Sequence, residues 1–176
     1  MNKTRTTGKG FTLIEIIVVL MIIGIIAALV LPRITAISGA ELKATARDLV
    51  GTVRLVYSTA AIKKLPYRIA FDLEKQIYWV EEKAGKEYVA SKEPLLGQRV
   101  IPDTVYIKRL DILKRTCSSY CKEYIYFTPG GYVEPASIYV ATLDNSQAMT
   151  VFIQPMTGRA EILLGEVSRE DWEKSQ

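Results

Sequence analysis

Histidine is absent from the 176-residue sequence, and only two cysteines are present. Without an imidazole, the chain can form neither a Ser-His-Asp nor a Cys-His catalytic arrangement, and it lacks the usual proton carrier near neutral pH. Two thiols are too few for a four-cysteine zinc site. The sequence therefore argues against hydrolases and zinc enzymes, and we expect no enzymatic activity, no bound metal and no cofactor.

Proline, glycine and aromatic residues are also sparse. The chain has 7 prolines, 11 glycines and 9% aromatic residues, beside 49% hydrophobic and 24% charged residues. This composition excludes collagen-like, disordered and disulfide-dense proteins. The length suits one small domain with an appendage.

The net charge of +4 is concentrated at the N-terminus. Lys3, Arg5 and Lys9 lie within the first ten residues, which contain no acidic residue. The remainder of the chain is nearly balanced in charge. The excess of basic residues therefore does not indicate a domain surface that attracts nucleic acid.

A long apolar run follows these charges. Residues 11–31 read FTLIEIIVVLMIIGIIAALVL, in which Glu15 is the only strongly polar residue. A helix of this length extends roughly 30 Å, the thickness of a bilayer core. Because the positive charges precede it, we predict a single transmembrane helix with its N-terminus in the cytoplasm. A cleaved secretory signal fits less well, because Leu31-Pro32-Arg33 replaces the small residues of its cleavage site.

Glu15 is the one costly residue in this run. A carboxylate at mid-bilayer costs about 2.5–3.5 kcal/mol and usually has a partner. Near the membrane boundary a hydrated carboxylate is one interpretation, and pairing with a cation of another chain is the other.

The neighbours of Glu15 favour the second interpretation. The segment KGFTLIE at residues 9–15, followed by the apolar run and Pro32, resembles the N-terminal signature of type IV pilins and of the pseudopilins of type II secretion. The resemblance implies that a prepilin peptidase cleaves between Gly10 and Phe11 and methylates the new amine of Phe11. It also implies that Glu15 pairs with the terminal amine of a neighbouring pilin-like subunit, and that the filament grows on an inner-membrane assembly platform.

Helical periodicity continues beyond Pro32. Six apolar residues recur at spacings of three and four and form one face of an amphipathic helix: Leu42, Ala46, Leu49, Val53, Val56 and Ala60. We expect this face to pack on the protein's own sheet, rather than to be reserved for a partner helix. Pro66 ends the helix at Ile62 or Lys64, and Pro32 and Ser38-Gly39 are places where it could bend.

The pattern then changes to short β-rich runs separated by turn residues. Strands are predicted at 67–72, 76–81, 105–112, 123–127, 137–143, 149–154 and 159–164. We predict an α+β fold in which a long N-terminal transmembrane helix packs on a small antiparallel β-sheet domain. Its segments are a cytoplasmic leader (1–10), a transmembrane part (11–31), an outer amphipathic part of the helix (32–64) and a globular periplasmic domain (65–176).

The C-terminal turn residues resemble one branch of the pilin-like proteins. The order YFTPGG at 126–131, TVFI at 150–153 and TGRA at 157–160 is similar to the H-type minor pseudopilins and T-type minor pilins, which share the GspH/FimT domain. This resemblance implies a minor pseudopilin of type II secretion. The alternative is a type IV pilus minor pilin that serves pilus assembly or DNA uptake. Residues 73–122 do not align with that pattern.

Cys117 and Cys121 form the most conspicuous local motif. After export, a CxxxC pair can form a disulfide if the backbone brings the sulfurs together. We favour a structural disulfide over a redox site, because the thioredoxin-type spacing is one residue shorter. Without export, two free thiols are the alternative.

Five basic residues gather at 103–122, namely Lys108, Arg109, Lys114, Arg115 and Lys122. A DNA-contacting patch is one interpretation, but Asp103 and Asp111 dilute it and aromatic residues are few. We favour a solvated strand face.

Three acidic features have structural interpretations. Glu81 and Glu82 are adjacent in a predicted strand, so their side chains point to opposite faces and share no acid-base site. Asp144-Asn145 supplies too few oxygen ligands for calcium and fits a hairpin turn. The acidic tail at 166–173 is a solvated end or a partner contact, and Trp172 is its one residue that could anchor another subunit.

Overall fold

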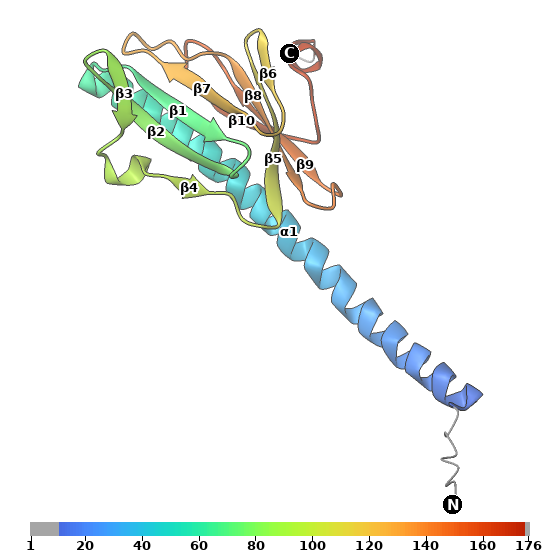
Figure 1. The fold of residues 1–176 in the computed structure, drawn as a ribbon. Coiled ribbons are helices and arrows are strands. Elements are labelled where there is room, and N and C mark those ends of the chain that lie inside the picture. The colour runs from blue at the N-terminus through green and yellow to red at the C-terminus, as the bar shows by residue number, and fades with distance from the viewer. Residues whose placement is uncertain (1–10, 175–176) are drawn as a thin grey trace, which may run out of the picture. The chain divides into compact units, whose positions relative to one another are not determined.

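The computed structural model describes residues 11–174, except for the side chains of 29–37 and 173. The chain divides into two compact units, Met1–Ile37 and Ser38–Gln176. The helix α1 (Leu13–Lys63) extends through the division between them, and the strands all belong to the second unit (Figure 1).

The first unit contains the apolar part of α1. In the portion of the chain that is described, no helix is long and apolar enough to be recognised as a membrane span.

The second unit begins with the amphipathic part of α1. The six apolar residues predicted to form its buried face are all less than 2% exposed, which confirms the predicted periodicity. The helix ends at Lys63, three residues before Pro66, and Lys64 has a positive φ of 56°. A residue in the left-handed region is a common helix stop.

Two antiparallel sheets lie on this part of the helix. The first has the order β3-β2-β1-β7, with β4 also paired to β2. Its strands are β1 (Tyr67–Asp72), β2 (Ile77–Ala84), β3 (Glu87–Ala90), β4 (Arg99–Val100) and β7 (Lys122–Phe127). A short 3-10 helix, η1 (Pro94–Leu96), connects β3 to β4.

The second sheet has the order β10-β9-β8-β5-β6. Its strands are β5 (Val105–Ile112), β6 (Arg115–Cys117), β8 (Ala136–Thr142), β9 (Ala148–Ile153) and β10 (Ala160–Leu164). All seven residues of β8 are buried, as expected for a central strand covered on both faces. A short helix, α2 (Arg169–Glu173), follows β10.

One hydrophobic core joins α1 to both sheets. It contains Leu49 and Val56 from the helix, Ile69 from the first sheet, and Ile138 and Val151 from the second. In Figure 1 the helix is seen behind β1 and β2, consistent with these shared buried side chains. Burial of this apolar surface is the main force that holds the unit together.

The α+β class and the antiparallel pairing are confirmed, and the structure adds that the strands form two sheets. Every strand predicted from the sequence exists within two residues at its start and three at its end. The three short strands β3, β4 and β6 and the helix α2 were not predicted. The strands fall into two sheets because β7 pairs with β1, whereas β5, which precedes β7 in the chain, pairs with β8.

Candidate assembly elements

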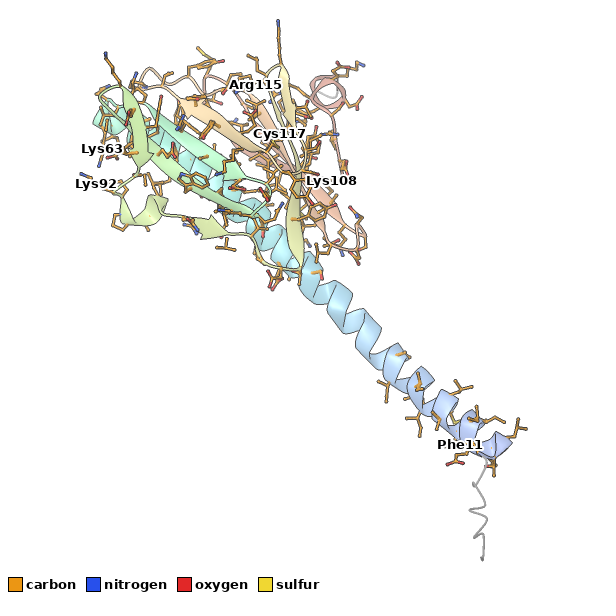
Figure 2. All side chains as sticks on the ribbon, in the orientation of Figure 1. Phe11, Lys63, Lys92, Lys108, Arg115 and Cys117 are labelled. Atoms are coloured by element: carbon orange, nitrogen blue, oxygen red, sulfur yellow. A yellow bond between two sulfur atoms is a disulfide. The ribbon has the colours of Figure 1, made fainter. Side chains whose placement is uncertain are left out.

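The described apolar side chains at the start of α1 are exposed on every face of the helix. Phe11 is 77% exposed, and the apolar side chains from Leu13 to Ile26 are 47–81% exposed. Figure 2 shows these side chains projecting around the helix near Phe11. A continuous apolar surface of this kind requires lipid or other helices to cover it. Gly10, on the other side of the predicted cleavage site, lies outside the described residues.

Glu15 is the third residue of α1, and its backbone N–H bonds to Thr12, which precedes the helix. The Thr12 hydroxyl accepts a hydrogen bond from the Glu15 backbone N–H at 3.3 Å, and the Thr12 carbonyl accepts bonds from Glu15 and Ile16. Thr12 therefore serves as the N-cap, and Glu15 stands where a capping box has its acidic residue. The Glu15 side chain is exposed. A carboxylate near the positive end of the helix dipole is favourable even before it finds an external partner.

The turn motifs of the C-terminal part converge on Tyr57 of α1. A Cβ on Gly158 would lie 2.3 Å from the Tyr57 ring carbon Cγ, and one on Gly131 would lie 3.2 Å from its hydroxyl. The same hydroxyl donates to the carbonyl oxygen of Met156 at 3.3 Å. Both glycines have positive φ, +61° at Gly158 and +86° at Gly131. The TGRA and TPGG turns thus pack closely against Tyr57 and hold the helix on the sheets, which is a structural role.

Cys117 and Cys121 form a disulfide with Cα atoms 6.2 Å apart. Cys117 ends β6 and is buried, and Cys121 precedes β7 and packs against the core. Ser119 and Tyr120, between them, both have positive φ. The bridge closes the turn where the chain passes from the second sheet to the first.

The basic residues at 103–122 are largely neutralised by acids. Lys108 pairs with Glu166, Arg109 with Asp111 and Lys122 with Asp72, while Arg115 pairs with both Glu123 and Glu134. The labels in Figure 2 place Lys108 and Arg115 apart on the molecule. A surface with its cations already paired has little charge to offer to a phosphate backbone.

The acidic motifs also have structural partners. Glu81 accepts from Arg68 and Glu82 from Tyr67, on the two faces of β2. Asp144 accepts from Thr142 and Ser146 within the β8–β9 turn, and these hydrogen bonds hold the pKa of its carboxyl below the usual value. Among the residues that the structure describes, no group of three potential ligands could hold a metal ion.

Trp172 packs inside its own chain. Its ring stacks on Phe152 of β9, with the ring centroids 5.4 Å apart. Ser168 caps the short helix that carries it, by accepting from the backbone N–H of Asp171. The tail therefore packs on the second sheet through Trp172, while the side chains of Glu166, Glu170 and Asp171 are exposed to solvent.

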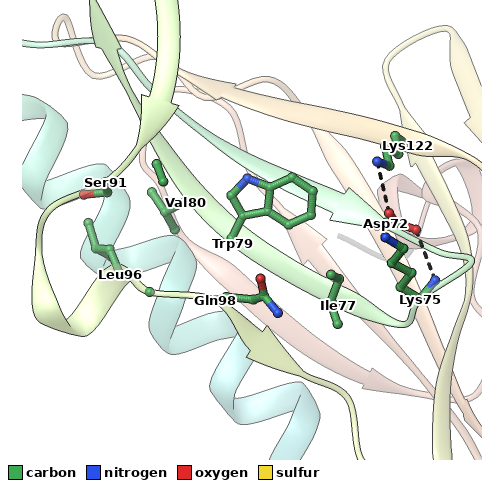
Figure 3. A pocket seen from close by; sticks show the side chains of 11 residues that line it. Asp72, Lys75, Ile77, Trp79, Val80, Ser91, Leu96, Gln98 and Lys122 are labelled. Atoms are coloured by element: carbon green, nitrogen blue, oxygen red, sulfur yellow. Dashed lines mark hydrogen bonds and ion pairs between the residues drawn. The ribbon is translucent and has the colours of Figure 1, made fainter.

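A pocket of about 280 Å³ opens beside β2, where the edge of the strand is unpaired between β3 and β4. Trp79 and Gln98 lie over it, and Asp72 and Lys122 lie at one end (Figure 3). Burial raises the pKa of Asp72, but the Lys75 backbone N–H at 3.1 Å and the Lys122 ammonium at 3.3 Å outweigh it and lower the pKa. The carboxylate is thus a satisfied ion and not a proton donor.

Sequence reasoning missed an aromatic cluster on the outer face of the first sheet. The Arg68 guanidinium lies 4.3 Å from the centroid of the Tyr88 ring and 4.0 Å from that of Tyr124. Glu81 joins the cluster by accepting from Arg68 at 2.5 Å and from the Trp79 indole at 2.7 Å. The alternation of these residues with buried ones in β1, β2 and β7 was the available signal, but it does not indicate which strands are neighbours.

The sequence matches the family described as the prokaryotic N-terminal methylation motif over residues 6–31. No curated protein matches the chain.

Two solved structures have a similar fold. The minor pseudopilin EpsH from the type II secretion system of Vibrio cholerae is 16% identical, and the match covers 72% of this chain and 99% of that chain with a TM-score of 0.56. Escherichia coli GspH is 12% identical, and the match covers 74% of this chain and 92% of that chain with a TM-score of 0.56. The chain thus joins a prokaryotic N-terminal methylation motif to the fold of the minor pseudopilins.

Proposed function

We propose that the chain is a minor pseudopilin, a structural subunit of the pseudopilus of a type II secretion system. The observation that carries this proposal is the combination of an N-terminal methylation motif at residues 6–31 with a fold similar to EpsH and GspH. The apolar surface of α1, exposed from Leu13 to Ile26, supports it because a helix packed among other helices or in lipid needs such a surface.

In this proposal the precursor inserts into the inner membrane with residues 1–10 in the cytoplasm. The prepilin peptidase cleaves between Gly10 and Phe11 and methylates Phe11. The membrane-spanning part of α1 then enters the filament, and the domain that begins near residue 65 lies in the periplasm. Glu15 pairs with the methylated amine of a neighbouring subunit, which compensates the cost of its charge in an apolar environment.

The role is structural and not catalytic. A catalytic site needs a nucleophile or base with convergent partners. Within the described residues, the acids and bases of the candidate motifs are held in ion pairs and turn hydrogen bonds, such as Asp72 with Lys122 and Asp144 with Ser146.

The proposal is tested by an in-frame deletion of the gene in its own organism, complemented with the full chain. We expect secretion of the system's extracellular substrates to fall at least about tenfold and to be restored by the wild-type chain, while surface pili are unchanged. A chain with Gly10→Val, which blocks the expected cleavage, serves as the matched control and should restore nothing. Loss of pili or of DNA uptake with normal secretion would instead assign the chain to a type IV pilus.

A further inference from the structure

Three basic side chains lie on one exposed face of α1 within the second unit. They are Lys43, Arg47 and Arg54, and all three are exposed. Their spacings of four and seven residues place them on the same side of the helix, beside the buried face. They extend over roughly 16 Å of the helix axis. We call these three residues the basic stripe.

The basic stripe gathers three cations without acidic partners among the described residues on one helix face, in contrast to the paired cations of the sheets. Cations elsewhere in the domain, such as Arg68, Arg99 and Arg115, have acidic partners. No hydrogen bond or ion pair within the described residues involves the three side chains of the stripe. The nearby acids of the helix are already engaged, because Glu41 accepts from Thr104 and Asp48 pairs with Arg99 at 3.7 Å.

The stripe also has room for a partner to approach. Gly51 lies between Arg47 and Arg54 on the exposed face, and a Cβ placed there would meet no atom within 4 Å. A glycine inside an exposed helix costs about 1 kcal/mol relative to alanine. The bare backbone at this position lets another protein surface come close between the flanking cations.

We propose that the basic stripe binds an acidic face of a neighbouring protein subunit in the filament. This inference rests on the proposed function and adds to it the chemistry of one partner. Unpaired cations attract carboxylates of a partner. Complementary charge across an interface fixes the register of the two surfaces and disfavours partners of like charge. Asp48, 65% exposed on its side chain, stands beside the stripe. The Asp48 carboxylate beside the stripe favours a protein partner, because it would repel the negative charge of lipid headgroups or of nucleic acid.

Charge reversal of the stripe in the full chain tests the proposal. The variant K43E/R47E/R54E is compared with K86E/K92E/K114E, which reverses three other exposed lysines without ion pairs and changes the net charge equally. We expect the stripe variant to reach the membrane, to be processed at Phe11 and to unfold at the same temperature as wild type. Its recovery in sheared filaments should fall about tenfold or more, while the control variant is recovered like wild type.

Equal recovery of the stripe variant and the control would overturn the proposal. If the wild-type chain is processed but absent from filaments, or is not processed, the proposed function fails and the inference fails with it. Flotation with phosphatidylglycerol vesicles provides a further arm. Because the apolar helix alone attaches the chain to vesicles, the readout is its preference for phosphatidylglycerol over phosphatidylcholine vesicles. Loss of that preference in the stripe variant with unchanged filament recovery would show that the stripe binds lipid, and this too would contradict the proposal.

A cysteine at Gly51 identifies the partner directly. Gly51→Cys fits without a clash, and the native cysteines are bonded to each other. A thiol-reactive photocrosslinker on this cysteine, with Lys86→Cys as the control position, is activated in assembled filaments. We expect the crosslinked peptide to belong to another filament subunit and to contain at least two acidic residues within about two helical turns. A crosslinked peptide without acids would contradict the proposal.

Discussion

At the scale of single residues, the capping position of Glu15 and its proposed pairing with another subunit can be separated. Its backbone N–H bonds to the capping residue Thr12, whereas its exposed carboxylate has no partner among the residues that the structure describes. The capping role is local, and the charge is available for another subunit. Sequence patterns predicted the second role through a resemblance, but the N-cap is read from the Thr12-x-x-Glu15 spacing only when the helix start is known.

Glu15→Ala should leave membrane insertion intact and impair incorporation into filaments, because the cap is retained while the charge is lost. Thr12→Ala is the matched control. It removes the capping hydroxyl at a cost of about 1 kcal/mol but keeps the carboxylate, so its incorporation should remain close to wild type. Incorporation is measured as recovery in sheared filaments relative to the membrane pool. Normal assembly of the Glu15 variant would remove the pairing role.

Gly158 is the residue whose substitution should destabilise the domain most clearly. Gly158→Ala places a Cβ 2.3 Å from the Tyr57 ring and keeps a φ of +61°. We expect it to lower the free energy of unfolding by about 2–4 kcal/mol, the sum of a steric clash and left-handed strain. Gly85→Ala, with a φ of +64° in open space, has the strain alone and should cost about 1–2 kcal/mol.

Urea unfolding of the full chain in detergent measures both changes. The Tyr57→Ala background should reduce the effect of Gly158→Ala to that of Gly85→Ala, since the clash is with the ring. Equal costs for the two glycine variants in the wild-type background would show that the close contact is absent.

At the scale of elements, the long strands could be predicted from the sequence and the short strands could not. Long strands such as β5 and β8 were predictable because apolar residues recur along them in runs bounded by turn residues. The strands β3, β4 and β6 have two to four residues each, too few for a period to be seen. Their positions follow from pairing with β2 and β5, which is tertiary information.

The candidate site was predictable where it rests on a contiguous motif and not where it rests on the fold. Glu15 and Phe11 follow from seven consecutive residues, 9–15. The contacts of Gly131 and Gly158 with Tyr57 join residues that are 74 and 101 positions apart, and local periodicity does not predict them. The same is true of the stacking of Trp172 on Phe152, which the sequence did not predict.

Removal of the disulfide by Cys117→Ser with Cys121→Ser should lower the free energy of unfolding by about 2 kcal/mol, because the bridge closes a small loop between β6 and β7. A reducing agent should have the same effect on the wild-type chain and none on the double variant. Unfolding curves recorded with and without dithiothreitol check both statements. Identical stability of wild type and variant without reductant would mean that the bridge does not stabilise the fold.

At the scale of the whole molecule, the two units have different surfaces. The first unit presents a helix that is apolar on every described face, and the second buries its own apolar surface in one core. Ion pairs neutralise cations such as Arg68 and Arg115, whereas the basic stripe of α1 presents three cations without ion pairs to described residues on one exposed face. A membrane-anchored filament subunit requires both properties, an assembling helix and a stable domain that carries recognition.

The central claim is that the chain is a processed pilin-like subunit, and the intact mass of the protein recovered from its own cell's membranes tests it most directly. The account predicts a species that begins at Phe11 and carries one added methyl group on its terminal amine. A species that retains Met1 through Gly10, in cells whose prepilin peptidase is active, would contradict it.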